Sequence, residues 1–133
     1  MNIEKLRVQE LMRTDVKLVN KSTPISKAAK MMRDSSVSSL IVEPDADGDA
    51  FGIITRKDII EAFLSSTMIG PAHLVEDIMT KPAITVNLGM SIYNCQQLMR
   101  MVGVRRLPVV DGNQLVGILS NADIFGKLLE DIA

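Results

Sequence analysis

Two short patterns in this chain combine residue types that could bind an anion. Thr55 and Asp58 follow Gly-Ile-Ile, and Ser120 and Asp123 follow Gly-Ile-Leu. At the start of a helix, a hydroxyl and a carboxylate at this spacing can cap unpaired backbone N–H groups as a variant of the capping box. The same helix start can instead receive a phosphate, and its aspartate can chelate a ribose diol. The residues alone leave both interpretations open, and the repetition of the pattern strengthens the ligand interpretation until the two are equally supported.

Positive charge is distributed unequally around the two patterns. Arg105 and Arg106 interrupt an apolar strand entrance, where guanidinium groups are costly unless they reach water or an anion. Alternation along a strand should send them to opposite faces. Ser38-Ser39 stands at the matching place in the first half, so the first pattern would have to borrow charge from a neighbour or from Arg56, Lys57 or Arg13. We therefore expect a diphosphate or triphosphate to prefer the pattern that ends at Asp123.

Both patterns lie inside an internal repeat, which is the feature to search for first in any sequence. A shift of 67 positions superimposes Val8 on Val75 and Met12 on Met79, and it continues to Val42 and Val109. After residue 44 the shift becomes 65, because the first copy has two extra residues in an acidic turn. The copies span residues 1–65 and 66–133, and residues 65–74 should form a linker between them.

Each copy predicts the element order β-α-β-β-α. The two central strands of the second copy are joined by Asp111-Gly112, a strong hairpin signal. Ser22, Thr23 and Pro24 should begin the first long helix, and Ser91 should cap its counterpart. The expected elements are strands at 16–19, 39–43 and 51–54 with helices at 25–33 and 56–64, and strands at 83–86, 106–110 and 115–119 with helices at 92–101 and 121–129.

The predicted fold class is therefore α/β (α+β), with two pseudo-symmetric motifs. A copy of about 60 residues is only marginally stable alone, because small chains bury too small a fraction of their surface. We expect the copies to pack sheet to sheet around a pseudo-twofold axis, with clefts along the seam.

Composition excludes several classes of function. A net charge of −1 provides no basic field for nucleic acid. The single cysteine, Cys95, is better explained as a small buried helix residue than as a nucleophile, and the only histidine, His73, lies in the expected linker. There is no cluster of metal ligands, no uninterrupted apolar run of about 18 residues and no leader-like apolar segment. We expect a cytoplasmic protein that contacts neither membrane nor nucleic acid.

Taken together, residues 8–132 resemble a tandem pair of CBS (cystathionine β-synthase) motifs. The second copy is the closer match, through Gly103-Val104-Arg105-Arg106-Leu107-Pro108-Val109-Val110-Asp111 and Gly117-Ile118-Leu119-Ser120-Asn121-Ala122-Asp123. The first copy departs from the pattern, with Ile41 in place of the strand proline and Ser36 in place of the glycine. These departures weaken the expectation of a ligand in the first copy.

The resemblance implies two clefts that bind adenosyl ligands such as AMP, ADP, ATP, S-adenosylmethionine or a dinucleotide. By this resemblance the two aspartates would hold ribose, Ser120 and Thr55 would touch ribose or phosphate, and Arg105 and Arg106 would meet phosphate. Backbone at 14–16 and 81–84 would border the base. The full set of expected ligand-binding residues is Asp123, Ser120, Asn121, Arg105, Arg106, Pro82, Ala83, Val104, Thr55, Asp58, Lys57 and Val16.

The sequence thus predicts a stand-alone regulatory module that binds a nucleotide, for example in energy sensing, and signals occupancy to a partner or to its own oligomer. It contains no arrangement of nucleophile and base, metal cluster or paired carboxylates, so we expect no enzyme activity and no cofactor. A homodimer is expected through the helices that carry Ile59, Phe63, Ile124 and Leu128. The alternative is a structural dimerisation or docking module whose clefts bind nothing.

Overall fold

The computed structural model describes residues 2–65 and 70–132 and has a mixed α+β fold with two three-stranded sheets. In each sheet, the first strand pairs in parallel with the second, which pairs antiparallel with the third. One sheet contains β1 (Leu18–Val19), β2 (Ser39–Val42) and β3 (Gly52–Thr55), and the other contains β4 (Val86–Asn87), β5 (Arg106–Asp111) and β6 (Gln114–Ser120). The predicted fold class is confirmed, although β1 and β4 are shorter than the sequence predicted.

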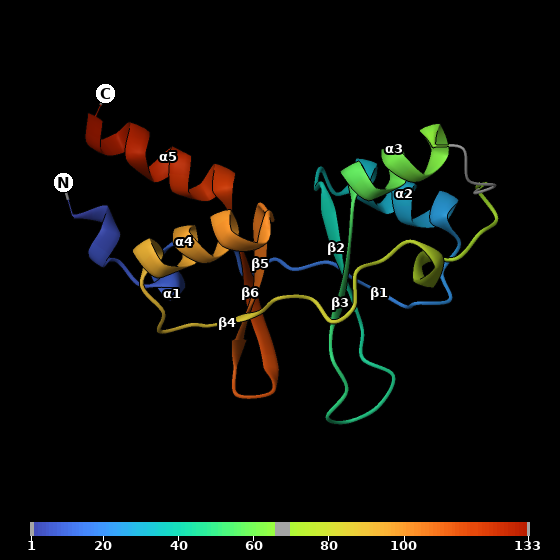
Figure 1. Ribbon diagram of the computed structural model, residues 1–133, viewed down its shortest axis with the longest axis horizontal. Coiled ribbons are helices and arrows are strands. Elements are labelled where there is room, and N and C mark those ends of the chain that lie inside the picture. The colour runs from blue at the N-terminus through green and yellow to red at the C-terminus, as the bar shows by residue number, and fades with distance from the viewer. Residues whose placement is uncertain (1, 66–69, 133) are drawn as a thin grey trace. The chain divides into compact units, whose positions relative to one another are not determined.

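The helices complete the predicted β-α-β-β-α order in both copies (Figure 1). A single helical turn, α1, lies in the opening segment of the first copy, and two short 3-10 helices lie at Ile3–Lys5 and Val75–Asp77. The helices are α1 (Val8–Leu11), α2 (Ile25–Asp34), α3 (Arg56–Leu64), α4 (Ile92–Val102) and α5 (Asn121–Ile132). The 3.6-residue apolar periodicity therefore located the four longer helices correctly.

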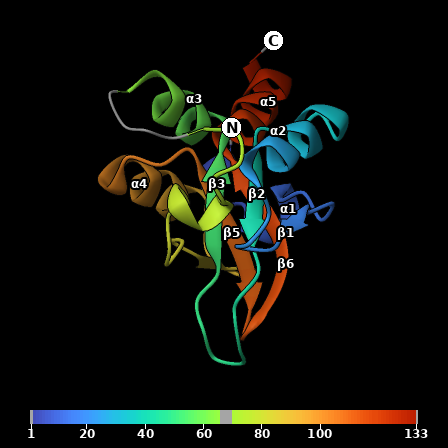
Figure 2. The same cartoon turned by 90° about the vertical axis from the view of Figure 1, so that its right-hand side faces the viewer.

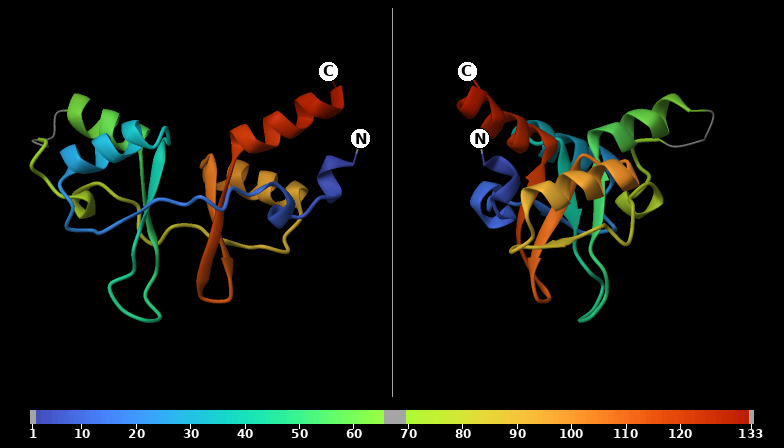
Figure 3. Two further views of the ribbon diagram at one scale, coloured as in Figure 1. Left: turned by 180° about the vertical axis from the view of Figure 1, so that it is seen from behind. Right: turned by 60° about the vertical axis from the view of Figure 1, so that its left-hand side comes forward.

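The compact units of the structure differ from the two sequence copies. One unit is Lys17–Ala83, which we call the Asp58 unit. The other, which we call the Asp123 unit, combines the chain up to Val16 with the chain from Ile84 onward. Each copy thus contributes its opening segment to the unit that holds the other copy's sheet. Figure 3 shows the blue N-terminal segment beside the red strand β6.

Equivalent backbone hydrogen bonds hold the two opening segments in place. Val8 N–H donates to Met90 O in the Asp123 unit at 2.8 Å, and Val75 N–H donates to Thr23 O in the Asp58 unit at 2.8 Å. Further along, Arg13 exchanges two hydrogen bonds of 2.9 Å with Ile118 on β6, and Thr80 exchanges two of 2.9 Å with Ile53 on β3. The outer edges of β3 and β6 therefore each have a bridge to an opening segment, which satisfies the backbone groups of Ile53 and Ile118.

The glycine of each Gly-Ile pattern allows this close approach. A Cβ on Gly117 would lie 2.7 Å from Arg13 O and 2.7 Å from Met12 Sδ. A Cβ on Gly52 would lie 3.1 Å from Val42 Cβ and 3.3 Å from Thr80 O. Glycine is needed where another backbone passes this close to a strand.

Each unit has its own apolar core. In the Asp58 unit, Ala28 and Met32 of α2 pack with Leu40 and Val42 of β2. In the Asp123 unit, Cys95 and Met99 of α4 pack with Leu107 and Val109 of β5, and Ile124 of α5 closes this cluster. The alternate strand residues Ile41 and Pro108 are also buried, as the near-continuous apolar runs predict.

This packing corrects two details of the sequence prediction. Ile124 is only 7% exposed and lies in its own core, and Ile59 and Leu128 are half-buried against theirs, so of the four expected contact residues only Phe63 is substantially exposed. The exposed apolar side chains of the last helices are instead Ile60, Phe63 and Leu64 on α3, and Phe125, Leu129 and Ile132 on α5.

The second correction concerns the start of α2. Pro24 is the N-cap residue and not the first helical residue, and no side chain caps this helix. The backbone carbonyls of His73 and Pro71 accept from the N–H groups of Ile25 and Ser26 at 2.8 and 3.1 Å. Part of the predicted linker therefore does the capping, while its middle, residues 66–69, lies outside the described residues. The prediction for α4 is confirmed, because Ser91 Oγ accepts from Asn94 N–H at 3.1 Å.

Candidate functional site

The carboxylate of Asp123 is hydrogen-bonded to Ser120, the last residue of β6, which directly precedes α5. Its Oδ2 accepts from Ser120 N–H at 3.0 Å and from the Ser120 hydroxyl at 2.8 Å, and Asp123 N–H donates back to Ser120 Oγ at 3.2 Å. This is the predicted capping-box variant, with β6 leading directly into the helix. The cap holds the carboxylate in one orientation at a helix start, where backbone N–H groups and the helix dipole favour negative charge.

The second oxygen of Asp123 has a partner that the sequence analysis assigned elsewhere. Arg13 Nε donates to Asp123 Oδ1 at 3.0 Å. The Arg13 side chain is 68% exposed, whereas that of Asp123 is only 10% exposed. Arg13 is one of the expected sources of charge for the first copy, but its carboxylate partner in the structure is Asp123 of the second copy. Arg13 and Thr80 are equivalent positions of the 67-residue repeat, but the repeat does not show which sheet edge each of them joins.

Asp58 forms the matching cap at the start of α3. Its Oδ2 accepts from Thr55 N–H at 2.8 Å, and Thr55 Oγ1 accepts from Asp58 N–H at 3.1 Å. Within residues 2–65 and 70–132, Asp58 Oδ1 accepts no hydrogen bond, and Thr80 stands where Arg13 stands in the other unit. The two caps are alike in backbone geometry and differ in how many acceptor positions remain.

The predicted neighbours of Asp123 are close to it in the structure. Arg106 pairs with Ser120 across β5 and β6, and Asn121 N–H donates to Arg105 O at 2.8 Å. Arg105 is exposed and Arg106 is half-buried, which agrees with the expected opposite orientations. Val104 precedes them and is half-buried, with its N–H bound to Met99 O at 3.0 Å.

The predicted neighbours of Asp58 form the equivalent arrangement with different side chains. Ser39 pairs with Thr55, and Arg56 N–H donates to Ser38 O at 2.9 Å. Positive charge therefore sits on the first two residues of the helix, Arg56 and Lys57, both exposed, and not at the strand entrance. Sequence analysis named Lys57 but left Arg56 out of the expected site.

The two backbone segments expected to border a base also divide between the units. Val16 belongs to the Asp123 unit, whereas Pro82 and Ala83 belong to the Asp58 unit. Ala83 N–H donates to Phe51 O at 2.8 Å, just before β3, and Ala83 is buried. The structure thus groups Val16 with Asp123, and Pro82 and Ala83 with Asp58.

An ion-pair network holds the long β2–β3 connection to the segment before Pro82. Lys81 Nζ lies 2.7 Å from Asp49 Oδ2 and 3.6 Å from Asp45 Oδ2, and Lys21 Nζ lies 3.0 Å from Asp45 Oδ2. The hydrogen bond from Lys81 is the main reason why the pKa of Asp49 falls to about 2. The same bond raises the pKa of Lys81. Figure 2 shows the loop extending from the strand ends away from α2 and α3.

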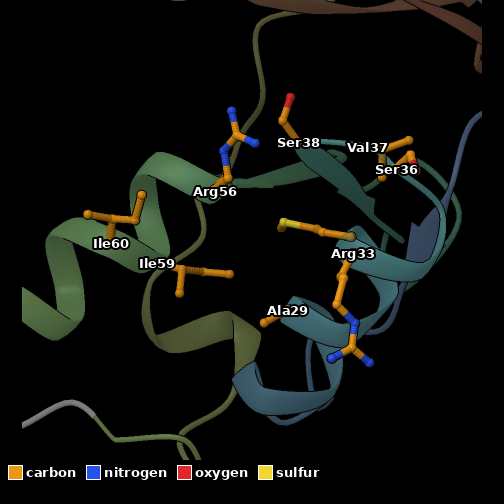
Figure 4. Close-up of a pocket in the computed structure, with 9 residues that line it drawn as sticks. Ala29, Arg33, Ser36, Val37, Ser38, Arg56, Ile59 and Ile60 are labelled. Carbon is orange, nitrogen blue, oxygen red and sulfur yellow. The ribbon is translucent and has the colours of Figure 1, made fainter.

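A cavity of about 640 Å³ opens between α2 and α3 in the Asp58 unit. Figure 4 shows Ile59 pointing into it, with Arg33 and Arg56 directed to opposite sides. None of the twelve predicted ligand-binding residues lines it; the lining residues are Ala29, Met32, Arg33, Ser36, Val37, Ser38, Arg56, Ile59 and Ile60. Because the two guanidinium groups diverge, they cannot hold one anion together.

Other candidate chemistries find little support in the structure. Cys95 is buried on α4, and burial raises the pKa of its thiol to about 11, so the thiolate is disfavoured at neutral pH. No three His, Cys, Asp or Glu residues among those described could hold a metal ion together. In the described part of the chain, no helix is long and apolar enough to cross a membrane.

Comparison with known proteins places both copies in one family. The CBS domain family matches residues 8–65 and again residues 75–130. The chain is 33% identical over 118 residues to the uncharacterized protein MK0525 of Methanopyrus kandleri, covering 88% of this chain and 60% of that protein. It is 32% identical over 118 residues to the CBS domain-containing protein YhcV of Bacillus subtilis, covering 88% of this chain and 81% of YhcV.

Solved structures agree with this assignment. A hexameric CBS-CP12 protein from bloom-forming cyanobacteria superimposes with a TM-score of 0.86 and 32% identity, covering 96% of this chain and 72% of that one. The CBS domain pair of protein MJ0100, solved in complex with 5′-methylthioadenosine and S-adenosyl-L-methionine, superimposes with a TM-score of 0.83 over 95% of this chain and 98% of that one. At 24% identity the MJ0100 comparison supports the fold alone.

Proposed function

The chain belongs to the CBS domain family, and from this premise we propose that it is a regulatory module that binds an adenosyl ligand at its two capping aspartates. AMP, ADP, ATP and S-adenosylmethionine are the compounds to test first. A CBS pair of the same fold, that of MJ0100, holds adenosyl compounds. The module would signal occupancy to a partner protein or to its own oligomer, without catalysing a reaction.

One observation carries the proposal: each unit presents an aspartate at the point where a strand becomes a helix, beside exposed cations. A carboxylate fixed by Ser120 or Thr55 can accept the two hydroxyls of a ribose, while nearby backbone N–H groups and arginines suit phosphate. Arg105 and Arg106 adjoin the Asp123 cap, and Arg56 and Lys57 adjoin the Asp58 cap. Both units are therefore proposed as binding sites, and the Asp123 unit is proposed as the principal one for nucleotides.

Thermal unfolding of the purified chain tests this directly. A ligand at about a hundred times its dissociation constant should add about 2.7 kcal/mol to the free energy of unfolding. The panel is AMP, ADP, ATP, S-adenosylmethionine and NAD, with inorganic phosphate as the control for a general anion effect. A melting temperature that none of these adenosyl compounds raises above the phosphate control would overturn the proposal.

A structural docking module is the second candidate, and the caps themselves favour it. The hydrogen bonds of Asp58 and Asp123 to the starts of α3 and α5 explain both aspartates without any ligand. In that case Asp58→Ala and Asp123→Ala would lower the melting temperature of the free protein. No adenosyl compound would raise the melting temperature of the unmodified chain.

Self-association is proposed for the exposed apolar face of α5. Phe125, Leu129 and Ile132 are 59%, 44% and 61% exposed and recur at helical spacing, which is typical of a contact surface. Phe125→Glu should shift the molecular mass measured by light scattering toward that of the monomer. Tyr93→Glu on α4, where the side chain is also more than half exposed, is the matched control. Equal masses for the Phe125→Glu variant and the unmodified chain would rule out this face.

A further inference from the structure

Arg13 limits what the Asp123 carboxylate can accept. A carboxylate has about four acceptor positions. Ser120 N–H, the Ser120 hydroxyl and Arg13 Nε already occupy three of those of Asp123, which leaves about one. Chelation of a ribose diol requires two. The diol can therefore bind Asp123 through both hydroxyls only after Arg13 has moved away.

Asp58 has no such restriction. Thr55 N–H is the one donor to its carboxylate within the described residues, so about three acceptor positions remain. The equivalent of Arg13 is Thr80. It has the same pair of 2.9 Å backbone hydrogen bonds to the neighbouring strand, but its side chain is a short, neutral hydroxyl that cannot form an ion pair with a carboxylate. The same backbone position thus holds a cation in one unit and a neutral side chain in the other.

Displacing Arg13 from Asp123 costs little free energy, and the displaced guanidinium can then pair with another anion. The Arg13 side chain is 68% exposed, and the diol hydroxyls that replace it keep the 10% exposed Asp123 carboxylate hydrogen-bonded, so we expect the loss of this ion pair to change the equilibrium constant by about fivefold. After displacement, the backbone of Arg13 remains hydrogen-bonded to β6. The guanidinium therefore stays within a side chain's length of a ligand bound at Asp123. A ligand phosphate would then replace the carboxylate as its partner, whereas an uncharged nucleoside would offer nothing in return.

We propose that Arg13 is a specificity residue that makes the Asp123 unit select phosphorylated adenosyl ligands over uncharged nucleosides. This inference rests on the proposed function, since it assumes that an adenosyl ligand binds at Asp123. The Asp58 unit, with Thr80 at the equivalent position, discriminates less between the two kinds of ligand.

The test compares ATP with adenosine at each unit separately. Backbone amide signals of residues 117–123 and 52–58, followed by nuclear magnetic resonance during titration of the full chain, report the two units independently. The variants are Arg13→Thr, which reproduces the other unit, and Thr80→Arg, which transfers the cation. Lys5→Thr removes the same charge from an exposed residue of the same opening segment and controls for the overall field.

In the Asp123 unit, Arg13→Thr should tighten adenosine binding by about threefold and weaken ATP binding by about tenfold. Lys5→Thr should change neither by more than about twofold. Thr80→Arg should raise the preference of the Asp58 unit for ATP. The inference is overturned if ligands bind but the ratio of the two affinities at residues 117–123 is the same with and without Arg13. If no adenosyl ligand shifts any signal in any variant, the proposed function itself fails.

Discussion

The Asp58 unit and the Asp123 unit share one backbone design and differ in the side chains that surround its aspartate. Both have a capped helix start, a neighbouring strand entrance and an opening segment paired to the outer strand. The charges are placed differently: Arg13 binds Asp123, and Arg105 and Arg106 lie at the entrance of β5, whereas Arg56, Lys57 and Lys81 belong to the unit of Asp58. Both units keep the backbone and capping hydrogen bonds that the fold requires. The charged side chains near the aspartate differ between them.

The connection between the central strands differs as well. β5 and β6 are joined tightly, with Asp111 paired to Gln114 and Gly112 at a φ of 62°. The β2–β3 connection is longer, and Lys81 binds it through Asp49. In the Asp58 unit, the cation closest to Pro82 is therefore already engaged with an acidic loop, which leaves Arg56 and Lys57 as the better candidates for phosphate.

The largest expected difference between the units concerns the glycines under the opening segments. Gly117→Ala should destabilise the protein by about 2–3 kcal/mol and Gly52→Ala by about 1 kcal/mol, because the added Cβ meets closer atoms at Gly117, the backbone oxygen of Arg13 among them. Urea denaturation measures both. Gly126→Ala on α5, where no atom lies within 4 Å of the new Cβ, is the control and should stabilise slightly. Equal losses of stability at Gly117 and Gly52 would show that the two opening segments accommodate an added Cβ equally well.

A smaller difference is expected in ligand binding. Asp123→Ala should weaken ATP binding about tenfold, which corresponds to about 1.4 kcal/mol, and Asp58→Ala should weaken it less. The reason is that Arg13 pairs with Asp123, and that Arg105 and Arg106 lie at the entrance of β5, the strand paired with the one that leads to Asp123. Isothermal titration calorimetry measures the affinities, and the melting temperature of each free variant corrects for the lost helix cap. A greater loss from Asp58→Ala would reverse our ranking of the two units.

The smallest effect should be the pH dependence that the Asp49–Lys81 pair contributes to the Asp58 unit. Because the folded pKa of Asp49 is about 2, below the ordinary value of 3.8, its contribution is fully present above about pH 4 and is lost as the pH falls toward 2. Asp49→Asn should therefore lower the melting temperature at pH 6 and lower it much less at pH 2, where the carboxyl is about half protonated. Asp111→Asn in the short connection is the control. A difference that persists undiminished at pH 2 would mean that Asp49 acts through packing and not through charge.

Much of the site was predictable from the sequence because capping chemistry is local. Ser120 and Asp123, like Thr55 and Asp58, act within one helical turn, so their hydrogen bonds follow from spacing alone. The pairing of Arg106 with Ser120 did not follow from the tight turn alone, because a bulge between Val109 and Val110 shifts the register by one residue. Arg13 at Asp123 was missed because the two residues are 110 positions apart in the chain and are joined only by the folded sheet.

The sequence by itself therefore determined the repeat, the element order and the two capped aspartates, since each depends on periodicity or on contacts a few residues apart. Only the tertiary structure decided which opening segment joins which sheet. Both outer strands offer the same unpaired edge, and the two segments have the same apolar pattern, so no local preference distinguishes the alternatives. That choice places Arg13 beside Asp123 and Thr80 beside β3, and the chemical difference between the two units follows from it.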